Sequence, residues 1–323
     1  MASKKKSDGN IVFLKVAVVS LMIAVAVLAI MLAVTMASVS SLYSTINSLK
    51  NQSSSQTTPP VTFAGLDQPL NASMLGVLNN QPLTKYELAG QGLLNGSYAS
   101  EVLISNNSKY KPYVVNGKPS VIYIGAITCP YCSENRWAMV LALAQFGNFS
   151  ALYQGYSAAQ DGDIPTIYFS KVDYNTSAGV DFNNSYSSKY INFISADYES
   201  PISGRFQVGP ISYFIAHSPN ATYSSAMSFM NSTNKFGGTP FTFWGGSLFT
   251  GADGVVLVNG SWTSMQAQTH AQIINQINAF NTTFSKAEFA AADVYISKVC
   301  PAINNTAQVC SLPAIRTLEN LTA

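Results

Sequence analysis

The longest apolar segment of the chain runs from residue 16 to residue 37 and is interrupted only by Ser20 and Thr35. Its 22 residues are enough to cross the hydrocarbon core of a bilayer as one helix. A cleavable signal peptide usually has a shorter apolar core, although Ala37-Ser38 would suit cleavage. Residues 16–37 are therefore predicted to form a retained transmembrane anchor, with cleavage as the alternative.

Positive charge predicts the orientation of this anchor. Lys4, Lys5, Lys6 and Lys15 all precede the apolar segment. Segments rich in lysine next to a membrane span stay in the cytoplasm. Residues 1–15 are therefore expected to be a cytoplasmic tail of a single-pass cell-membrane protein, with the C-terminal part of the chain outside the cytoplasm.

The next segment, residues 38–62, consists mostly of Ser, Thr, Asn and Gln and ends near the sequence Thr57-Thr58-Pro59-Pro60. Such a composition cannot bury a hydrophobic core. The segment is predicted to be a tether. The roughly 260 residues that follow it are enough for one large domain.

Beyond the tether, strand and helix patterns alternate. The run Ser120–Ile127 is apolar at consecutive positions, as in a central parallel strand, and a helical spacing of apolar residues follows it as far as Gly147. Thr166–Val172 is predicted to be the second strand of this βαβ unit. These elements predict an α/β fold with a mixed sheet and flanking helices.

Further elements are predicted on both sides of this unit. Short strands are expected at Tyr190–Ile194 and Gly254–Gly260. Helices are expected at Asp67–Leu78, Leu83–Leu94, Ile211–Met230 (with a break at Pro219), Trp262–Phe280 and Phe284–Val299.

Charge is scarce in this chain. Charged residues make up 10% of it, against about 25% in ordinary soluble proteins. Beyond Ala37 there are 13 Lys and Arg residues and 14 Asp and Glu residues, a net charge of −1. No basic stripe is present, so we expect no nucleic-acid partner.

Asparagine supplies much of the polarity and is placed unevenly. Thirteen of the 26 asparagines begin an Asn-x-Ser/Thr sequon, where random placement would give about 5. Clustering of these residue types in loops is the alternative explanation, but the excess favours dense N-glycosylation of a surface protein. The candidates are Asn51, Asn71, Asn95, Asn106, Asn148, Asn175, Asn183, Asn220, Asn231, Asn259, Asn281, Asn304 and Asn320.

The candidate chemistry lies where the strand at 120–127 meets the following helix, in Cys129-Pro130-Tyr131-Cys132. A thiol at a helix N-terminus is close to free backbone N–H groups, which favour the thiolate that attacks disulfides. A second cysteine three residues later can resolve the mixed disulfide. Pro130 suits the first turn of a helix. The sequence therefore predicts a redox-active dithiol with Cys129 attacking and Cys132 resolving.

Two other readings of this motif stay open from the sequence. One is half of a zinc site, which would need two further ligands. The only candidates are Cys300, Cys310, His217 and His270, and no metal site is expected from them. The other is an inert structural disulfide between Cys129 and Cys132.

Cys300 and Cys310 are themselves expected to form a stabilising disulfide, with a shuttle pair for the dithiol as the alternative.

The Cys-Pro-Tyr-Cys motif and Gly238-Thr239-Pro240-Phe241 together resemble the thioredoxin superfamily. More closely, Gly125, Cys129–Cys132 and the sequence Arg136-Trp137-Ala138, behind an N-terminal anchor, are similar to the archaeal and actinobacterial membrane proteins of the uncharacterised family DUF929. The resemblance covers residues 110–282 and implies a thioredoxin-like fold. It leaves residues 63–109 as an N-terminal extension and 283–323 as a C-terminal helix and tail.

In that superfamily a cis-proline faces the dithiol and helps to position the substrate chain. The resemblance assigns this role to Thr239 and Pro240, with Pro165 as a rival that more simply begins the second strand. It also implies an insertion at about 174–236, in part a helical cap. One departure is that Tyr123 stands where many thioredoxins have a buried acid, which leaves the proton acceptor unassigned.

Three residues after the motif have competing readings. For Glu134, an exposed charge in the first turn of the helix is favoured over a role as the proton acceptor. Arg136 either favours a thiolate or has an ordinary surface or capping role. Trp137 is expected in the core rather than in contact with substrate.

These predictions lead to a membrane-anchored, extracytoplasmic thiol–disulfide oxidoreductase that needs no cofactor and acts on exported or surface polypeptides. A redox partner or a larger membrane complex would then supply or remove electrons. The direction of transfer is not set by the sequence. The alternative is a non-catalytic, glycosylated surface or assembly protein on a thioredoxin scaffold.

Overall fold

The structure is a computed structural model that describes residues 65–98, 110–172, 179–199, 208–250 and 264–321. Every described residue belongs to one compact unit, residues 63–323. The predicted anchor at 16–37, the tether and the strand at 254–260 lie outside the described residues. None of the helices in the described ranges is long and apolar enough to cross a membrane.

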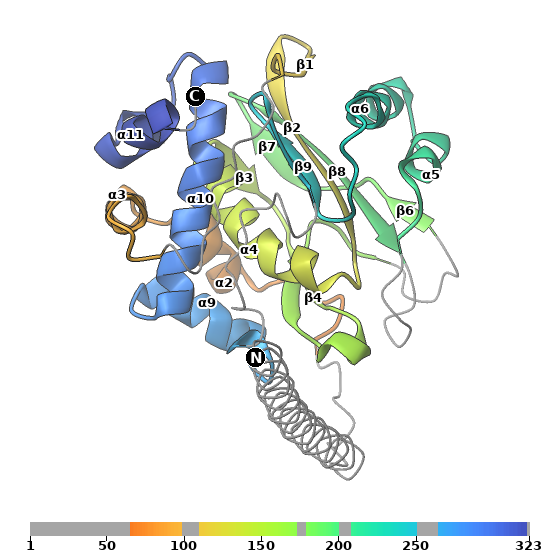
Figure 1. The fold of residues 1–323 in the computed structure, drawn as a ribbon. Coiled ribbons are helices and arrows are strands. Elements are labelled where there is room, and N and C mark those ends of the chain that lie inside the picture. Colours follow the sequence, from red (N-terminus) through yellow and green to blue (C-terminus); the bar gives the residue numbers. More distant parts are fainter. Residues whose placement is uncertain (1–64, 99–109, 173–178, 200–207, 251–263, 322–323) are drawn as a thin grey trace, which may run out of the picture. The chain divides into compact units, whose positions relative to one another are not determined.

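A mixed sheet forms the centre of the described unit, in the strand order β10–β9–β2–β8–β6 (Figure 1). β2 is parallel to β8 and antiparallel to β9, while the outer pairs β9–β10 and β6–β8 and the short pair β1–β2 are antiparallel. The strands are β1 (Val114–Val115), β2 (Lys118–Ala126), β6 (Gly179–Asp181), β8 (Asn192–Glu199), β9 (Phe241–Trp244) and β10 (Ser247–Thr250).

Strand β2 is the axis of this sheet, because it is buried from Ser120 to Ala126. Alternate residues of a strand point to opposite faces, and β2 divides its side chains in this way between two cores. Val121 and Tyr123 belong to the core cluster that includes the long helices, whereas Ile122 and Ile124 belong to the cluster on the other face. This double burial explains why the sequence shows a continuous apolar run rather than an alternation.

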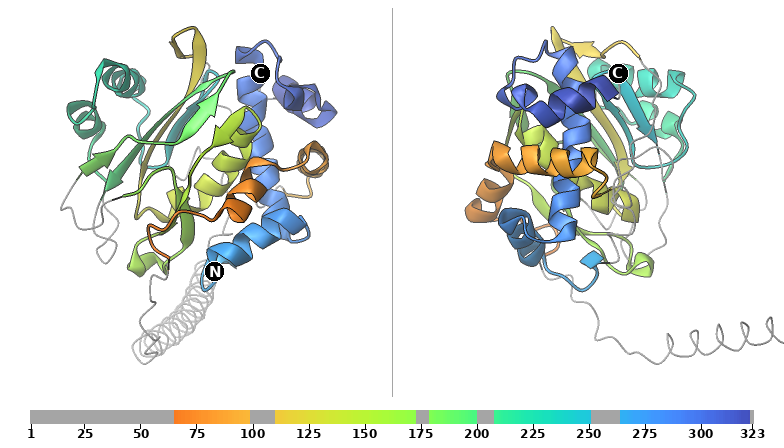
Figure 2. Two further views of the ribbon diagram at one scale, coloured as in Figure 1. Left: turned by 180° about the vertical axis from the view of Figure 1, so that it is seen from behind. Right: turned by 60° about the vertical axis from the view of Figure 1, so that its left-hand side comes forward.

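Helices cover both faces of the sheet, as the views in Figure 2 show. α4 (Pro130–Ala144) and α10 (Thr283–Ala302) lie on one face, and α5 (Ile211–Ala216) and α6 (Ala221–Ser232) on the other. The predicted break at Pro219 is confirmed by the separation of α5 from α6.

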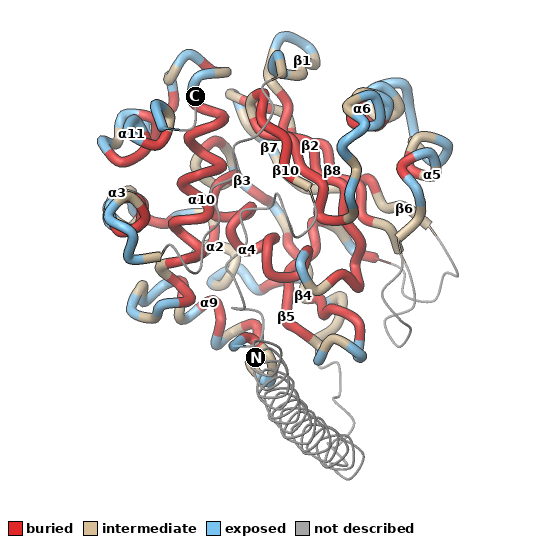
Figure 3. Tube along the Cα trace, viewed as in Figure 1, coloured by how far each residue is buried: buried red, intermediate tan, exposed pale blue. Residues whose placement is uncertain are grey.

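Most of the remaining helices pack against α10, which is buried along nearly its whole length (Figure 3). A helix that is enclosed on all sides has an apolar pattern without a polar face. α3 (Leu83–Leu94), α9 (His270–Ala279), α11 (Pro313–Leu321) and the 3-10 helix η2 (Gln308–Ser311) pack against α10, and α2 (Ala72–Asn79) packs against α4 and α9. Cys300, in the last turn of α10, forms a disulfide bond with Cys310 of η2, as expected, with Cα atoms 5.5 Å apart.

Two predictions about the strands were wrong. β5 (Pro165–Tyr168), expected to lie beside β2, pairs with β4 (Tyr153–Tyr156) in a separate two-stranded sheet. The parallel neighbour of β2 is β8, which lies inside the segment 174–236 expected to be an insertion. β5 and β8 are both short, buried strands, and nothing in a local pattern says which of them pairs with β2.

The other two-stranded sheet joins β3 (Gly147–Phe149) to β7 (Tyr186–Ser188). Between β4 and β5 lies the 3-10 helix η1 (Ala159–Asp161). Thus most of the described strands between α4 and β8 form these smaller sheets, and only β6 pairs with β8 at the edge of the central sheet.

Candidate active site

The Cys-Pro-Tyr-Cys turn lies where β2 ends and α4 begins. Cys129 is the N-cap of α4, and Pro130 occupies the first turn, where its missing N–H leaves no hydrogen bond unmade. The backbone N–H of Cys132 donates to Cys129 Sγ over 3.2 Å. Both cysteines are free thiols. The predicted position of the dithiol at a strand-to-helix junction is therefore confirmed.

Thr239 and Pro240 are brought to the dithiol by the pairing of β9 with β2. Phe241, the first residue of β9, is opposite Ile124 near the end of β2. The Cys129 thiol donates to the carbonyl oxygen of Thr239 at 3.5 Å, and the Thr239–Pro240 peptide is cis. The rival, Pro165, begins β5, and its carbonyl accepts a hydrogen bond from the buried indole of Trp137 over 3.2 Å.

Both thiols are buried, with exposed fractions of 0%. Ala126 lies with them in a small apolar cluster, against which Tyr198 and Val208 pack. Tyr131, between the two cysteines, is 38% exposed. A reaction with a macromolecular substrate would therefore require movement of the residues that cover the sulfur atoms.

A buried ion pair lies behind the dithiol. Arg136 is one helical turn after Cys132, is fully buried, and donates from Nη2 to Asp197 Oδ1 at 2.5 Å. The same nitrogen donates to the carbonyl oxygen of Ala126 at 3.0 Å. Of the two readings of Arg136, the surface position is excluded.

Asp197 was missed by the sequence reasoning, although it is a buried acid in the middle of a buried strand. It lies in β8 directly beside Gly125 of β2. The Tyr123 hydroxyl donates to Asp197 Oδ1 over 3.0 Å. The structure thus has a buried carboxylate near the dithiol, but it comes from the neighbouring strand rather than from position 123.

Aromatic rings enclose the guanidinium group of Arg136. Its central carbon lies 5.1 Å from the ring centre of Tyr168 and 5.6 Å from that of Tyr123, distances at which a cation is attracted to an aromatic face. Burial raises the pKa of Tyr123 well above its ordinary value, so its hydroxyl stays protonated and remains a donor to Asp197.

The two thiols differ in acidity. Burial raises the pKa of Cys129, and the hydrogen bond and charge of Cys132 add to the rise. Burial also acts to raise the pKa of Cys132, but the hydrogen bond from Cys129 and the positive charge of Arg136 outweigh it and lower that pKa. The first ionisation of the dithiol therefore leaves its negative charge on the sulfur atom nearer Arg136.

The prediction that Glu134 is exposed was wrong, because it is only 1% exposed. α10 packs along this side of α4, and the neighbouring Asn135 donates to Tyr295 of α10 at 2.7 Å. Burial, followed by the charge of Glu134, raises the pKa of Glu288 in α10. The buried position of Glu288 therefore favours its protonated form.

The histidines are not part of the candidate site. His270 is buried at the start of α9 and contacts the carbonyl oxygens of Gly155 and Thr166 at 2.9 and 2.8 Å. His217 is exposed and stacks on Tyr213 with ring centres 3.9 Å apart. Within the described ranges, no three His, Cys, Asp or Glu side chains are grouped so that they could hold a metal ion.

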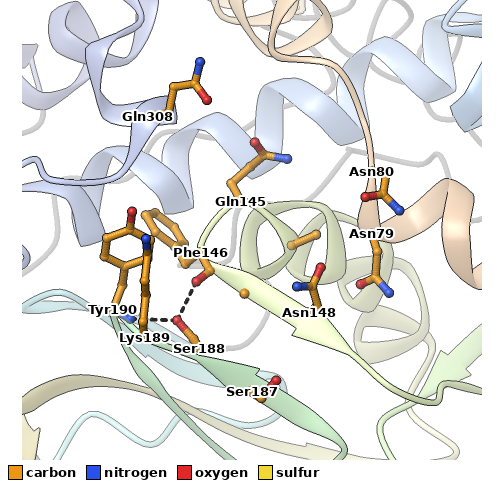
Figure 4. Close-up of a pocket in the computed structure, with 12 residues that line it drawn as sticks. Asn79, Asn80, Gln145, Phe146, Asn148, Ser187, Ser188, Lys189, Tyr190 and Gln308 are labelled. Atoms are coloured by element: carbon orange, nitrogen blue, oxygen red, sulfur yellow. Dashed lines mark hydrogen bonds between the residues drawn. The ribbon is translucent and has the colours of Figure 1, made fainter.

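A separate, open hollow of about 760 Å³ lies at the opposite end of α4 (Figure 4). The fifteen residues of α4 would extend about 22 Å, so this hollow is far from the dithiol. No thiol or carboxylate lines it, and we place no chemistry there. The lining includes the amides of Asn79, Asn80, Gln145, Asn148 and Gln308.

The sequon asparagines share one structural property. All nine that fall in the described ranges are exposed, whereas only five of the ten other described asparagines are. The nine are Asn71, Asn95, Asn148, Asn183, Asn220, Asn231, Asn281, Asn304 and Asn320, and Asn51, Asn106, Asn175 and Asn259 lie outside those ranges.

Comparison with known proteins gives one family match. The family model described as "Domain of unknown function (DUF929)" matches residues 104–300, which is more than half of the chain and includes the dithiol, Arg136, Asp197 and Thr239. Neither the curated proteins nor the solved structures contain a match. The chain therefore belongs to the DUF929 family.

Proposed function

We propose that the chain is a membrane-anchored, extracytoplasmic thiol–disulfide oxidoreductase. The observation that carries the proposal is the pair of free cysteines at the N-terminus of α4, with the Thr239 carbonyl oxygen 3.5 Å from Cys129 Sγ. One thiol is held at a helix terminus, the second lies three residues later in the first turn of the same helix, and a backbone carbonyl faces the first.

The connectivity of the sheet supports a thioredoxin-like fold. The thioredoxin superfamily named from the motifs places its dithiol between two parallel strands, followed by an antiparallel pair that begins at the facing proline. β2, α4 and β8 correspond to the first part, and β9 and β10 to the second. On this correspondence α5 and α6 form the helix between the two halves, rather than a cap.

The reaction needs only sulfur chemistry. Cys129 first passes its proton to the Cys132 thiolate, to which it is hydrogen-bonded. The resulting Cys129 thiolate attacks a substrate disulfide, so that a Cys129–substrate disulfide forms and the other substrate sulfur leaves as a thiolate. Cys132 then attacks Cys129 Sγ, which forms the Cys129–Cys132 disulfide and releases the second substrate thiolate. Two electrons and two protons pass from the dithiol to the substrate, and the reverse sequence oxidises a substrate dithiol.

The expected location determines the class of substrate. With an anchor at 16–37 and glycans on the exposed sequons, the dithiol would lie outside the cytoplasm. Disulfides persist in that setting, and exported or surface polypeptides are the natural substrates there. A redox partner or a membrane complex would restore the starting state of the dithiol.

Trapping of the mixed disulfide tests this proposal. Cys132→Ser removes the resolving thiol, so the variant should accumulate a covalent adduct with a disulfide-containing peptide, visible by intact mass. Cys129→Ser and the double variant should form none. If all three variants formed the adduct equally, or if none of them formed it, the assigned roles would be contradicted.

A second candidate is a non-catalytic, glycosylated surface or assembly protein on the same scaffold. The complete burial of both thiols and the exposure of all nine described sequon asparagines favour it. In that case the Cys129–Cys132 pair, once oxidised, would resist dithiothreitol while the protein stays folded. Reversible reduction under those conditions would favour the oxidoreductase.

A further inference from the structure

We propose that Arg136 is a positioning residue for the dithiol: its buried guanidinium stabilises the Cys132 thiolate, and Asp197 limits this stabilisation by sharing the positive charge. This inference rests on the proposed thiol–disulfide exchange. It names the pair of charges that sets the balance between the dithiol and the disulfide, a balance that the cysteine motif alone does not determine.

The helix geometry places Arg136 next to the sulfur atoms. Residues four apart on a helix lie on the same face, so Arg136 and Cys132 share one face of α4. Arg136 Nη2 also contacts the carbonyl oxygen of Ala126, at 3.0 Å, and Ala126 packs against both cysteines. The guanidinium group therefore lies beside a residue that packs in one cluster with both cysteines.

The hydrogen bonds of Arg136 are one-sided. Both of them are made by Nη2, while Nε and Nη1 are buried and have no hydrogen-bond partner among the described residues. Its one anionic partner there, Asp197, accepts from Tyr123 with the same oxygen. A buried cation is stable only when it is well paired. A second anion at Cys132 would complete the pairing, and the reduced dithiol can provide it.

Other ionisable groups around the pair do not replace Arg136. Tyr123 and Tyr168 present their rings to the guanidinium. Asp181 of β6 lies opposite Asp197 in the antiparallel β6–β8 register, and Glu199 follows two residues later in β8. Asp181 and Glu199 thus lie in β6 and β8, next to Asp197 of the Arg136–Asp197 ion pair. In the described chain, Arg136 is thus the cation that acts on Cys132.

The two members of the ion pair should act on the dithiol in opposite directions. The disulfide form has no charge for Arg136 to stabilise, whereas the reduced form has a thiolate. Removing the positive charge with Arg136→Met should therefore favour the disulfide. Removing the negative charge with Asp197→Asn leaves Arg136 less neutralised and should favour the reduced form. A purely structural role would move both variants in the same direction.

Equilibration of the full-length chain with glutathione buffers, read by intact mass after acid quenching and alkylation, measures this balance. We expect the equilibrium constant to shift about tenfold in opposite directions for the two variants, about 30 mV each way. Ultraviolet absorbance of the thiolate against pH should show ionisation at higher pH in Arg136→Met and at lower pH in Asp197→Asn.

Two further variants keep the test decisive. Arg136→Lys retains a positive charge, so its equilibrium constant should lie between those of wild type and Arg136→Met. It serves in place of Arg136→Met if that variant does not fold. Glu288→Gln changes a fully buried acid of α10 that has no contact with the dithiol, and it should leave the constant unchanged.

The outcomes separate this inference from the function on which it rests. If the wild-type pair exchanges with glutathione but the two charge variants shift together or not at all, the role of Arg136 is wrong and the oxidoreductase stands. If the wild-type pair does not exchange with glutathione in the folded protein, the proposed function itself fails.

Discussion

At Gly125 the lack of a side chain creates the space behind the dithiol. A Cβ atom at this position would lie 1.8 Å from Tyr123 Oη and 2.8 Å from Asp197 Oδ1. Both atoms belong to the hydrogen bond that holds Asp197 beside Arg136. The glycine of the family resemblance therefore has a local reason: a larger residue would separate the tyrosine from the carboxylate.

Gly125→Ala should accordingly destabilise the fold by about 1–3 kcal/mol, the usual cost of overpacking a filled core, and should displace Tyr123 or Asp197. Urea unfolding measures the change. Gly76 in α2 is the matched control, because nothing lies within 4 Å of a Cβ built there. Gly76→Ala should leave the fold stable or stabilise it by about 0.4–1 kcal/mol. Equal effects of the two substitutions would contradict this account of Gly125.

Asp181 makes stability depend on pH. Burial is the main cause that raises the pKa of Asp181 to about 6. Hydrogen bonds from Asn183 act to lower this pKa, whereas the negative charges of Asp197 and Glu199 act to raise it. Since the unfolded carboxyl has a pKa near 3.9, the folded state binds more protons between pH 4 and pH 6. Asp181 therefore favours folding at low pH, and that contribution is lost as the pH rises through about 6.

The corresponding prediction concerns the difference in unfolding free energy between pH 4 and pH 7. In the wild type, Asp181 adds to the unfolding free energy at pH 4 relative to pH 7. Asp181→Asn should make the difference between the two pH values smaller by up to about 3 kcal/mol. Denaturant unfolding at the two pH values measures it. An unchanged difference in the variant would show that Asp181 titrates normally in the folded protein.

At the scale of elements, the sequence predicted the strand–dithiol–helix unit and most helices but not the strand order. β2 and α4 were found because both are continuous apolar patterns joined by a distinctive turn. β5 was predicted to be the parallel neighbour of β2, but β8 takes that place. Pairing between distant strands depends on which faces the whole chain can bury, so a local pattern does not determine it. Asp197 was missed for the same reason: its role follows only from its position beside Gly125. The burial of Glu134 likewise depends on α10, which lies about 150 residues later in the chain.

The disulfide at the end of α10 belongs to this scale as well. Cys300 and Cys310 connect the last turn of the buried helix to η2, against which α11 packs. Replacing both by serine should lower the unfolding free energy by about 2–4 kcal/mol, because the unfolded chain loses its crosslink. Thermal or denaturant unfolding measures the loss. Thiol–disulfide exchange at Cys129 should be unaffected if the C-terminal pair is structural, and a loss of exchange would favour the shuttle reading instead.

At the scale of the molecule, exposed sequons form a pattern that can be tested site by site. Asn71 and Asn220 are N-caps that accept backbone hydrogen bonds through Oδ1, so the amide nitrogen remains available for a glycan. Asn183 instead donates from its amide nitrogen to Asp181 at 2.8 Å. Glycopeptide mass spectrometry of the native protein should find Asn71 and Asn220 more fully occupied than Asn183. A bare polypeptide mass would contradict N-glycosylation altogether.

The central claim is that Cys129 and Cys132 form a dithiol that exchanges with disulfides in the folded protein. Redox titration of the purified chain against glutathione, read by intact mass while circular dichroism monitors the fold, tests it most directly. The account predicts reversible loss and gain of two hydrogens at Cys129 and Cys132, with Cys300–Cys310 unchanged. A pair that stays locked in one state across the whole range of buffers, in protein that remains folded, would contradict it.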